Sequence, residues 1–276
     1  MTHLSLFSGI GGLDLAAEWA GFETVGQCEF ADFQTKVLEK HWPDVPRWRD
    51  IRTLTKESFY EKTGMQTVDC ISGGFPCQPF SVAGKQKGKG DDRYLWPEML
   101  RVIRELAPRC VVGENVSGIL RIAAADVVED LEREGYNVVV FAFEAASVGA
   151  PHRRERVAFV AYAHCRTMRN DGEDQWETNR EEHTSLHTSI SFGDGTAMAD
   201  TEGGGQQGKL SERRKAWGSR CKSWWTVEPD VGRMAYGIPA RVDRLNSLGN
   251  AVVPQQFYPI FKAIHDEMEE ANETTD

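Results

Sequence analysis

One cysteine stands where the neighbouring residues would present its thiol rigidly. Cys77 lies in "GGFPCQPFS", directly after an apolar run and between Pro76 and Pro79. Because proline restricts the backbone, a thiol between two prolines samples few conformations. A rigidly presented thiol suits nucleophilic catalysis, whereas most cysteines are buried and inert. The context favours Cys77 as a nucleophile, and we interpret the other five cysteines as structural.

A carboxylate occupies a similar place after a second apolar run. In "VVGENVSGIL", Glu114 and Asn115 follow two valines and a glycine. Partial desolvation there would raise the pKa of Glu114 and let its carboxyl group donate a proton. A helix cap or an ordinary surface glutamate explains the segment equally well when it is considered alone.

A glycine-rich turn near the N-terminus could bind a nucleotide-like ligand. The segment "LSLFSGIGGLDLA" contains Gly9, Gly11 and Gly12. Glycines let the backbone approach a ligand closely, and a helix N-terminus offers free N–H groups. Glu29 could then accept hydrogen bonds from ribose hydroxyls, and Asp50 with Ile51 could contact an adenine. The spacing indicates an adenosine-type cofactor rather than NAD specifically, although the glycines alone also fit a purely structural turn.

Composition bounds the class of protein. The chain has 276 residues, a formal charge of −10, and six cysteines without a CxxC pair, so neither a disulfide framework nor a metal cluster is expected. No apolar run is long enough for a membrane span, and no basic region precedes the first apolar stretch, so we expect a cytoplasmic protein.

The distribution of charge matters more than its sum. Residues 266–276 hold six carboxylates and no lysine or arginine. In contrast, "KLSERRKAWGSRCKSWW" holds six basic residues and three tryptophans against one glutamate. Basic residues among aromatics suit a surface that follows phosphates and stacks on bases, although a solvated charged face is the alternative.

The elements that must position these residues alternate along the first part of the chain. Apolar runs predict strands over residues 3–8, 23–30, 67–74, 109–116, 137–145 and 156–163. Helical spacing is found over residues 12–22, 31–42, 96–108 and 123–136. This alternation predicts an α/β fold with a parallel, doubly wound, Rossmann-like sheet and a ligand site at the carboxyl ends of the strands.

The composition changes near residue 164 and again near residue 237. We expect a first domain over residues 1–163 and a polar, glycine-rich region over residues 164–236, which is a small loop-rich domain or partly disordered. Residues 237–276 recover helical spacing and are expected to pack back on the first domain.

Five motifs together resemble one family. "FSGIGG", "GGFPCQPFS", "ENV", "RRERV" and "GNAVVP" follow one another over residues 7–254. Their order is similar to that of the DNA cytosine-5 methyltransferases, in particular the compact phage and prokaryotic type. Two differences stand out: His152 replaces the glutamine that is common before the paired arginines, and the motif before "GNAVVP" is only loosely recognisable.

The resemblance implies a mechanism. Cys77 would attack carbon 6 of a flipped-out cytosine, and Glu114 would contact its N3 and amino group. Carbon 5 would take the methyl group of S-adenosylmethionine, leaving S-adenosylhomocysteine. Arg156 would reach the cytosine O2, and Arg154 a phosphate or the catalytic loop. Since two arginines alternating on a strand point the same way, we expect both in one pocket.

The resemblance also implies binding residues and a target-recognition domain over residues 164–236. The cofactor would contact Phe7, Ser8, Gly9, Gly11, Gly12, Glu29, Phe30, Asp50, Ile51, Pro76, Leu95, Asn250 and Val252. DNA would contact Gln78, Ser81, Lys85, Lys87, Arg93, Arg213, Arg214 and Lys215. Residues 81–96 resemble the mobile catalytic loop, with glycines suited to a hinge.

The expected partner is duplex DNA, bound by a monomer, and the type also allows for a separate cognate restriction endonuclease. Three alternatives differ in chemistry. The same reaction on RNA would require tRNA to compete with DNA. A methylation-dead DNA-binding protein would have lost Cys77 or Glu114, and both are present. A thiol-redox enzyme would need a partner cysteine close to Cys77 in the sequence, and none is there.

Overall fold

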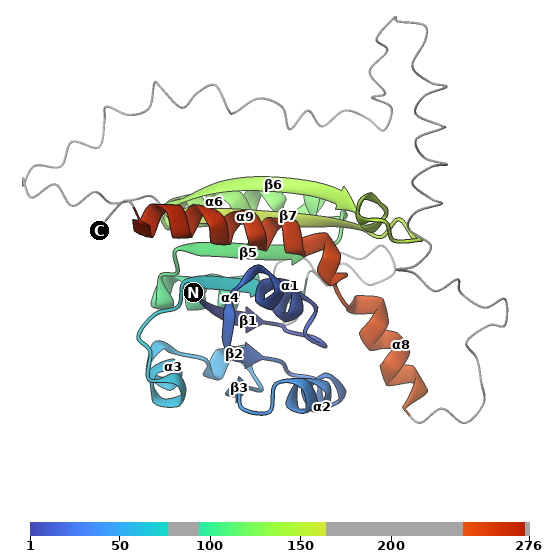
Figure 1. The fold of residues 1–276 in the computed structure, drawn as a ribbon, viewed down its shortest axis with the longest axis horizontal. Coiled ribbons are helices and arrows are strands. Elements are labelled where there is room, and N and C mark those ends of the chain that lie inside the picture. The colour runs from blue at the N-terminus through green and yellow to red at the C-terminus, as the bar shows by residue number, and fades with distance from the viewer. Residues whose placement is uncertain (77–93, 164–239, 274–276) are drawn as a thin grey trace, which may run out of the picture. The chain divides into compact units, whose positions relative to one another are not determined.

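The computed structural model describes residues 1–76, 94–163 and 240–273 (Figure 1). The chain divides into two units, Met1–His164 with Val227–Asp276, and Cys165–Thr226. The second unit lies outside the described residues.

Seven strands of the described chain form one sheet in the order β3-β2-β1-β4-β5-β7-β6. The strands are β1 (Thr2–Leu6), β2 (Glu23–Cys28), β3 (Arg47–Trp48), β4 (Cys70–Gly73), β5 (Cys110–Asn115), β6 (Tyr136–Glu144) and β7 (Glu155–Ala163). The chain starts in the middle at β1, runs outward to β3, and then returns past β1 to β4. This reversal between β1 and β4 is the switch point at which α/β sheets bind ligands.

The expectation of a wholly parallel sheet is wrong at one edge. β3, β2, β1, β4 and β5 pair in parallel, but β7 is antiparallel to both β5 and β6. Only a short 3₁₀ helix, η3 (Ala145–Val148), lies between β6 and β7. Since a parallel return needs a crossover of a dozen residues or more, the chain turns back and inserts β7 between its neighbours.

Helices cover both faces of the sheet (Figure 1). They are α1 (Gly12–Ala20), α2 (Asp32–His41), α3 (Lys56–Thr63), α4 (Trp96–Leu106), α5 (Ile119–Ile122), α6 (Ala124–Arg133), α8 (Arg241–Asn250) and α9 (Pro254–Glu273), with a further 3₁₀ helix η1 (Ile51–Thr53). A strand that ends near Asp50 was expected and is present as β3, whereas α3 was not expected, because one weakly apolar helix gives little periodic signal.

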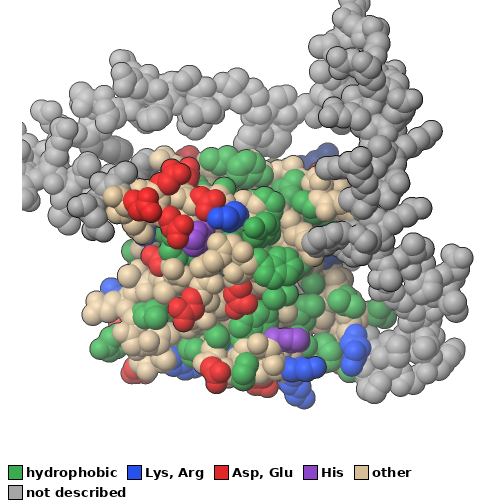
Figure 2. All heavy atoms as spheres, viewed as in Figure 1, with side chains coloured by type: hydrophobic (Ala, Val, Ile, Leu, Met, Phe, Trp, Pro, Cys, Tyr) green, Lys and Arg blue, Asp and Glu red, His purple; other side chains and the backbone are tan. Residues whose placement is uncertain are grey.

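The last helix, α9, packs on α1. On α9, Phe257, Phe261 and Ile264 are fully buried and share one core cluster with Ala16 and Ala20 of α1. Their spacing puts them on one side of α9, while small alanines on α1 let the two helices approach closely. The acidic residues between positions 266 and 273 belong to the last turns of α9, and Figure 2 shows acidic side chains gathered there.

The inner strand β5 shows that both faces of the sheet are covered. Val111 belongs to the core cluster that α4 and α6 help to form, whereas Cys110 and Val112 belong to the cluster of α1 and α9. Neighbouring residues of a strand point to opposite faces, so an apolar run rather than an alternating pattern results. None of the helices in the described ranges is both long and apolar enough to span a membrane.

Candidate functional site

The glycine turn follows β1 at the switch point of the sheet. Phe7, Gly9 and Gly11 all have positive φ angles, of 52°, 57° and 87°. A side chain on Gly11 would lie 2.4 Å from the ring of Trp42, so both the conformation and the space there demand glycine. At Gly9, no atom of the part of the chain that the structure describes lies within 4 Å of the missing side chain. The turn therefore leaves its backbone open on the Gly9 side.

Glu29 is tied to this turn by the backbone. It directly follows β2, and its carboxylate accepts hydrogen bonds of 2.8 Å from the N–H groups of Gly9 and Ala31. Burial raises the pKa of Glu29, although these hydrogen bonds oppose the shift. The next ring, Phe30, is 76% exposed. An acidic acceptor and an open aromatic face thus stand beside the glycine turn.

Asp50 and Ile51 follow β3, the neighbour of β2. The Asp50 carboxylate caps η1 by accepting a hydrogen bond of 3.0 Å from Arg52 N. Ile51 is buried in the core, and its carbonyl accepts a hydrogen bond from Arg101. The structure therefore brings Glu29 and Asp50 to the same edge of the sheet, whereas the Ile51 side chain points into the core.

The segment between α8 and α9, residues 251–253, lies against the start of α1. A side chain on Gly12 would come within 2.8 Å of Val252 O and 3.2 Å of Val252 Cβ. This contact joins positions 240 residues apart and places the end of "GNAVVP" beside the glycine turn. We call residues 251–253 the α8–α9 linker.

A buried ion pair lies at the ends of β5 and β7. Arg156 Nε is 2.8 Å from Glu114 Oε1, and the two side chains are only 11% and 10% exposed. Opposite charge holds the pair, because Arg156 is the neighbouring charge that most opposes the effect of burial on Glu114. Burial raises the pKa of Glu114 to about 7 against the opposing charges of Arg156 and Arg154. The direction expected from the sequence is confirmed.

The same carboxylate rests on the segment that leads to Cys77. Glu114 Oε2 would lie 2.8 Å from a side chain on Gly74, so only glycine admits it there. Asn115 Nδ2 donates a hydrogen bond of 3.0 Å to Phe75 O. The sequence holds no local signal for this contact, because it depends on β4 and β5 lying side by side. Both residues thus fix the backbone two or three residues before Cys77.

Arg154 differs from the expectation for the paired arginines. It precedes β7 and has a φ of 39°, so the alternation of a strand does not extend to it. Its Nη2 donates hydrogen bonds to Gly249 O, at 2.8 Å, and to Ala251 O. Burial lowers the pKa of Arg154, as does the neighbouring charge of Arg156, while Glu114 acts in the opposite sense. The guanidinium thus binds the end of α8 and the α8–α9 linker.

Several predicted residues lie outside the described ranges. They are Cys77, Gln78, Ser81, Lys85, Lys87, Arg93, Arg213, Arg214 and Lys215. Of the segment expected to be a mobile loop, residues 94–96 are described. Leu95 precedes the first residue of α4, and its carbonyl accepts a hydrogen bond from Met99 N.

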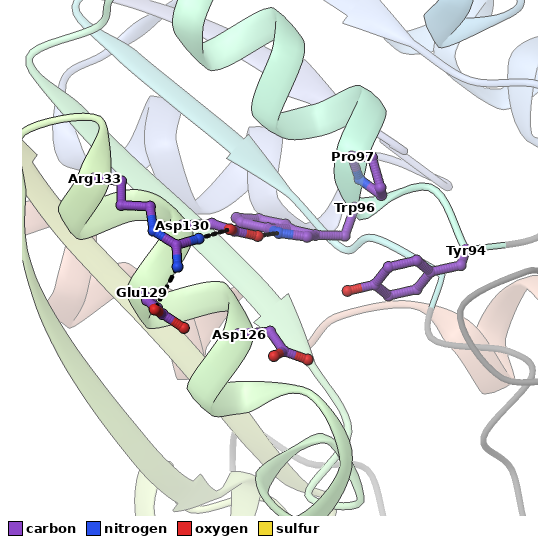
Figure 3. A pocket seen from close by; sticks show the side chains of 7 residues that line it. All are labelled: Tyr94, Trp96, Pro97, Asp126, Glu129, Asp130 and Arg133. Atoms are coloured by element: carbon purple, nitrogen blue, oxygen red, sulfur yellow. Dashed lines mark hydrogen bonds and ion pairs between the residues drawn. The ribbon is translucent and has the colours of Figure 1, made fainter.

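A hollow of about 440 Å³ lies beside the start of α4 (Figure 3). Tyr94, Trp96, Pro97, Asp126, Glu129, Asp130 and Arg133 line it. Trp96 Nε1 donates to Asp130, while Arg133 pairs with Asp130 and Glu129, so these groups are satisfied by one another. Burial and the carboxylates raise the pKa of Tyr94 to about 12. Three carboxylates against one arginine make this wall unsuited to phosphates.

The fold and these residues define a class: α/β proteins that bind a nucleotide-like cofactor at the switch point and hold a buried carboxylate beside it. A family model described as C-5 cytosine-specific DNA methylase matches residues 1–228. The chain belongs to this family.

Curated relatives agree with the family match. The chain is 36% identical to the type II methyltransferase M.FnuDI of Fusobacterium nucleatum, over 59% of this chain and 47% of that protein. M.AquIA of Picosynechococcus sp. is 36% identical over 57% of this chain and 70% of its own length. M.Eco47II of Escherichia coli is 30% identical over 78% and 51%. The chain thus spans about half the length of most of these relatives.

Solved structures share the fold. A chain described as a DNA modification methyltransferase encoded within an Escherichia coli prophage superposes with a TM-score of 0.51 at 26% identity, over 59% of this chain and 47% of that one. A mutant of DNMT2 from Spodoptera frugiperda gives the same TM-score at 24% identity, over 63% and 53%.

Proposed function

We propose that this protein transfers a methyl group from S-adenosylmethionine to carbon 5 of cytosine within a short duplex DNA sequence. One observation carries the proposal most directly. The buried pair of Glu114 and Arg156 stands against Gly74, three residues before Cys77, in a chain of the C-5 cytosine-specific DNA methylase family.

The residues around the glycine turn fit the cofactor of this reaction. The open side of Gly9 admits a ligand, Glu29 and Asp50 supply carboxylates for hydroxyl and amino groups, and the exposed Phe30 ring supplies a stacking face. When bound, S-adenosylmethionine supplies an electrophilic methyl group. Phe7, Ser8, Gly11, Gly12, Ile51, Pro76, Leu95, Asn250 and Val252 complete the proposed cofactor-binding set.

The protein's own groups would activate the base. The Cys77 thiolate would form a bond to carbon 6 of the cytosine, which makes carbon 5 nucleophilic. Once carbon 5 carries the methyl group, a base would remove its proton, and the bond between carbon 6 and Cys77 would break to release the thiolate. Glu114, with a pKa near 7, is protonated often enough to hold a proton at N3 as negative charge develops on the ring. Arg156 keeps Glu114 in place and offers a donor to the cytosine O2. Because the target carbon is inaccessible in a stacked duplex, the base must leave the helix.

Further assignments belong to the same proposal. Residues 164–236 recognise the target sequence, with Arg213, Arg214 and Lys215 among the residues that contact DNA. In the preceding segment, Gln78, Ser81, Lys85, Lys87 and Arg93 do so. The protein acts as a cytoplasmic monomer, and a restriction endonuclease of the same specificity acts separately.

The test is base-resolution mapping of 5-methylcytosine. Unmethylated genomic DNA is incubated with S-adenosylmethionine and either the wild-type protein or Cys77→Ser. We expect methylation in one short sequence context with the wild-type protein only, while Cys77→Ser still binds DNA. Methylation of tRNA instead of DNA would move the proposal to an RNA substrate. Equal turnover by Cys77→Ser would overturn the role of the cysteine.

A further inference from the structure

A buried glutamine on α9 has no role in the proposed chemistry. Gln256 is 2% exposed, and its Nε2 donates hydrogen bonds to Phe143 O at 2.9 Å and Arg154 O at 3.2 Å. Its Oε1 has no hydrogen-bond partner among the described residues. An unpaired buried acceptor costs free energy, so an amide would be unfavourable here without a compensating gain. The two hydrogen bonds that the amide donates supply that gain.

One of those bonds holds the backbone of Arg154. A positive φ is unfavourable for a residue with a side chain and persists only where the surroundings enforce it. The amide of Gln256 on one side and η3 on the other both bond the Arg154 carbonyl, the latter through Ala145 N. The left-handed conformation turns the Arg154 side chain away from the course of β7.

Turned in this way, the Arg154 guanidinium acts as the C-terminal cap of α8. The last carbonyls of a helix have no partner within the helix, and α8 has no basic residue in its last turn. Arg154 supplies the missing donor by binding Gly249 O and Ala251 O. A cation at this end also suits the helix dipole. The start of the α8–α9 linker is thereby fixed.

The fixed linker forms one wall of the glycine turn. Val252 follows the bonded Ala251 carbonyl by one residue, and its backbone lies against Gly12. A series of contacts therefore runs from Gln256 through Arg154 to the linker and on to the proposed cofactor site. Arg154 also lies close enough to Glu114 for their charges to interact, so it stands between the two halves of the site.

We infer that Arg154 and Gln256 are positioning residues, which form a latch that holds the α8–α9 linker against the glycine turn and so determines the affinity for the cofactor. This inference rests on the proposed function. It departs from one of the two contacts expected for Arg154, that with a DNA phosphate rather than that with the catalytic loop, because the Arg154 Nη2 is already bonded to two carbonyls.

Calorimetric titration with S-adenosylhomocysteine tests the latch in the full chain. Gln256→Met keeps the approximate shape of the side chain and removes both donors, while Arg154→Lys keeps the charge and loses the planar fork. If the linker is held in place only about a tenth of the time, each dissociation constant rises about tenfold. Arg153→Met is the matched control, because that side chain is 87% exposed and pairs with Glu144 instead.

Three further measurements separate the possible outcomes. Thermal unfolding without ligand shows whether each variant is folded at the titration temperature, and amide exchange over residues 249–253 reports the linker directly. We expect faster exchange there in both latch variants. DNA affinity at two salt concentrations should stay unchanged in Arg154→Lys.

The outcomes distinguish a failure of the latch from a failure of the proposed function. Wild-type affinity in Gln256→Met and Arg154→Lys would overturn the latch and leave the proposed function standing. A weakened, salt-dependent DNA affinity with intact cofactor affinity would return Arg154 to phosphate binding and also overturn the latch. If the wild-type protein bound no S-adenosylhomocysteine, the latch and the proposed cofactor would fail together. If Gln256→Met did not fold, Arg154→Lys alone would decide.

Discussion

The two halves of the candidate site, the glycine turn and the surroundings of Glu114, use different chemical groups. Around the glycine turn the ligand-facing groups are mainly backbone, and contacts such as Gly11 with Trp42 and Gly12 with Val252 leave no room for a side chain. Around Glu114 the working groups are two side-chain charges, taken from solvent and set 2.8 Å apart. One half depends on shape and the other on electrostatics.

This difference predicts how each half fails. The backbone groups of the glycine turn do not titrate, and their close packing makes this half sensitive to an added methyl group. A buried ion pair is sensitive to the loss of either charge, because the remaining charge is left without a partner in a medium of low dielectric constant.

The largest effect is expected at the charged half. Glu114→Gln removes the group that would hold a proton at N3, so the rate of methyl transfer should fall about 10³-fold, within the range found for general acid–base groups. Initial rates with saturating DNA measure this, and S-adenosylhomocysteine affinity should change little. Glu155→Gln, the exposed neighbour of Arg156, is the control. A rate near that of the wild-type protein would exclude Glu114 from the chemistry.

A buried carboxylate beneath the glycine turn gives the next largest effect, on stability. Asp14 is fully buried and accepts hydrogen bonds from Ser5 Oγ at 2.8 Å and Gln27 Nε2 at 2.7 Å, and burial raises its pKa to about 6. Because both partners are neutral, they stabilise the ionised carboxylate less than a directly bonded cation would. The folded state therefore holds a proton that the unfolded state releases near pH 3.8.

The proton held by Asp14 makes the free energy of unfolding depend on pH. The stabilising contribution of Asp14 is present below pH 3.8 and is lost as the pH rises through about 6, amounting to about 3 kcal/mol. Asp14→Asn removes it, since an amide can still accept from Gln27 and donate to Ser5. Urea unfolding at several pH values should show a smaller decline in the free energy of unfolding for the variant. Parallel curves would contradict the assignment.

At the backbone half, the addition of one methyl group should be enough to weaken cofactor binding. Gly12→Ala strains no dihedral angle, because the positive φ angles of the turn lie elsewhere, but its Cβ would press on Val252 O. The linker must shift, so affinity for S-adenosylhomocysteine should fall about tenfold, or 1.4 kcal/mol. Gly118→Ala, with a φ of −56° and open space around it, should have no effect. Unchanged affinity in Gly12→Ala would show that the linker is not a wall of the site.

The smallest expected effect is a shift in the pKa of Glu114. In Arg156→Met the carboxylate of Glu114 loses the neighbouring charge that most opposes its desolvation, so its pKa should rise above the wild-type value of about 7. Carboxyl carbon NMR of glutamate-labelled protein measures the midpoint, and the Glu114→Gln spectrum identifies the signal. A midpoint that stays fixed or falls would mean that Arg156 does not interact with Glu114 in solution.

Much of the fold and of the site could be predicted from the sequence, for a local reason. The alternation of apolar runs and helical spacing is a property of neighbouring residues, so it indicated the α/β class and placed Glu29, Asp50 and Glu114 after strands. The ordered motifs identified the family, and the family model over residues 1–228 confirms it. The apolar spacing of α9 likewise predicted that the C-terminal segment packs back.

Other features depend on contacts between distant segments, and only the tertiary structure decided them. No local pattern places β7 antiparallel between β5 and β6, because strand order follows from which connection is long enough to cross. The conformation of Arg154 depends on a glutamine 102 residues away. The pKa of Glu114 depends on how deeply β5 and β7 bury it beside Gly74. The sequence by itself determined which chemical groups are present, and long-range packing decided their partners, their direction and their charge.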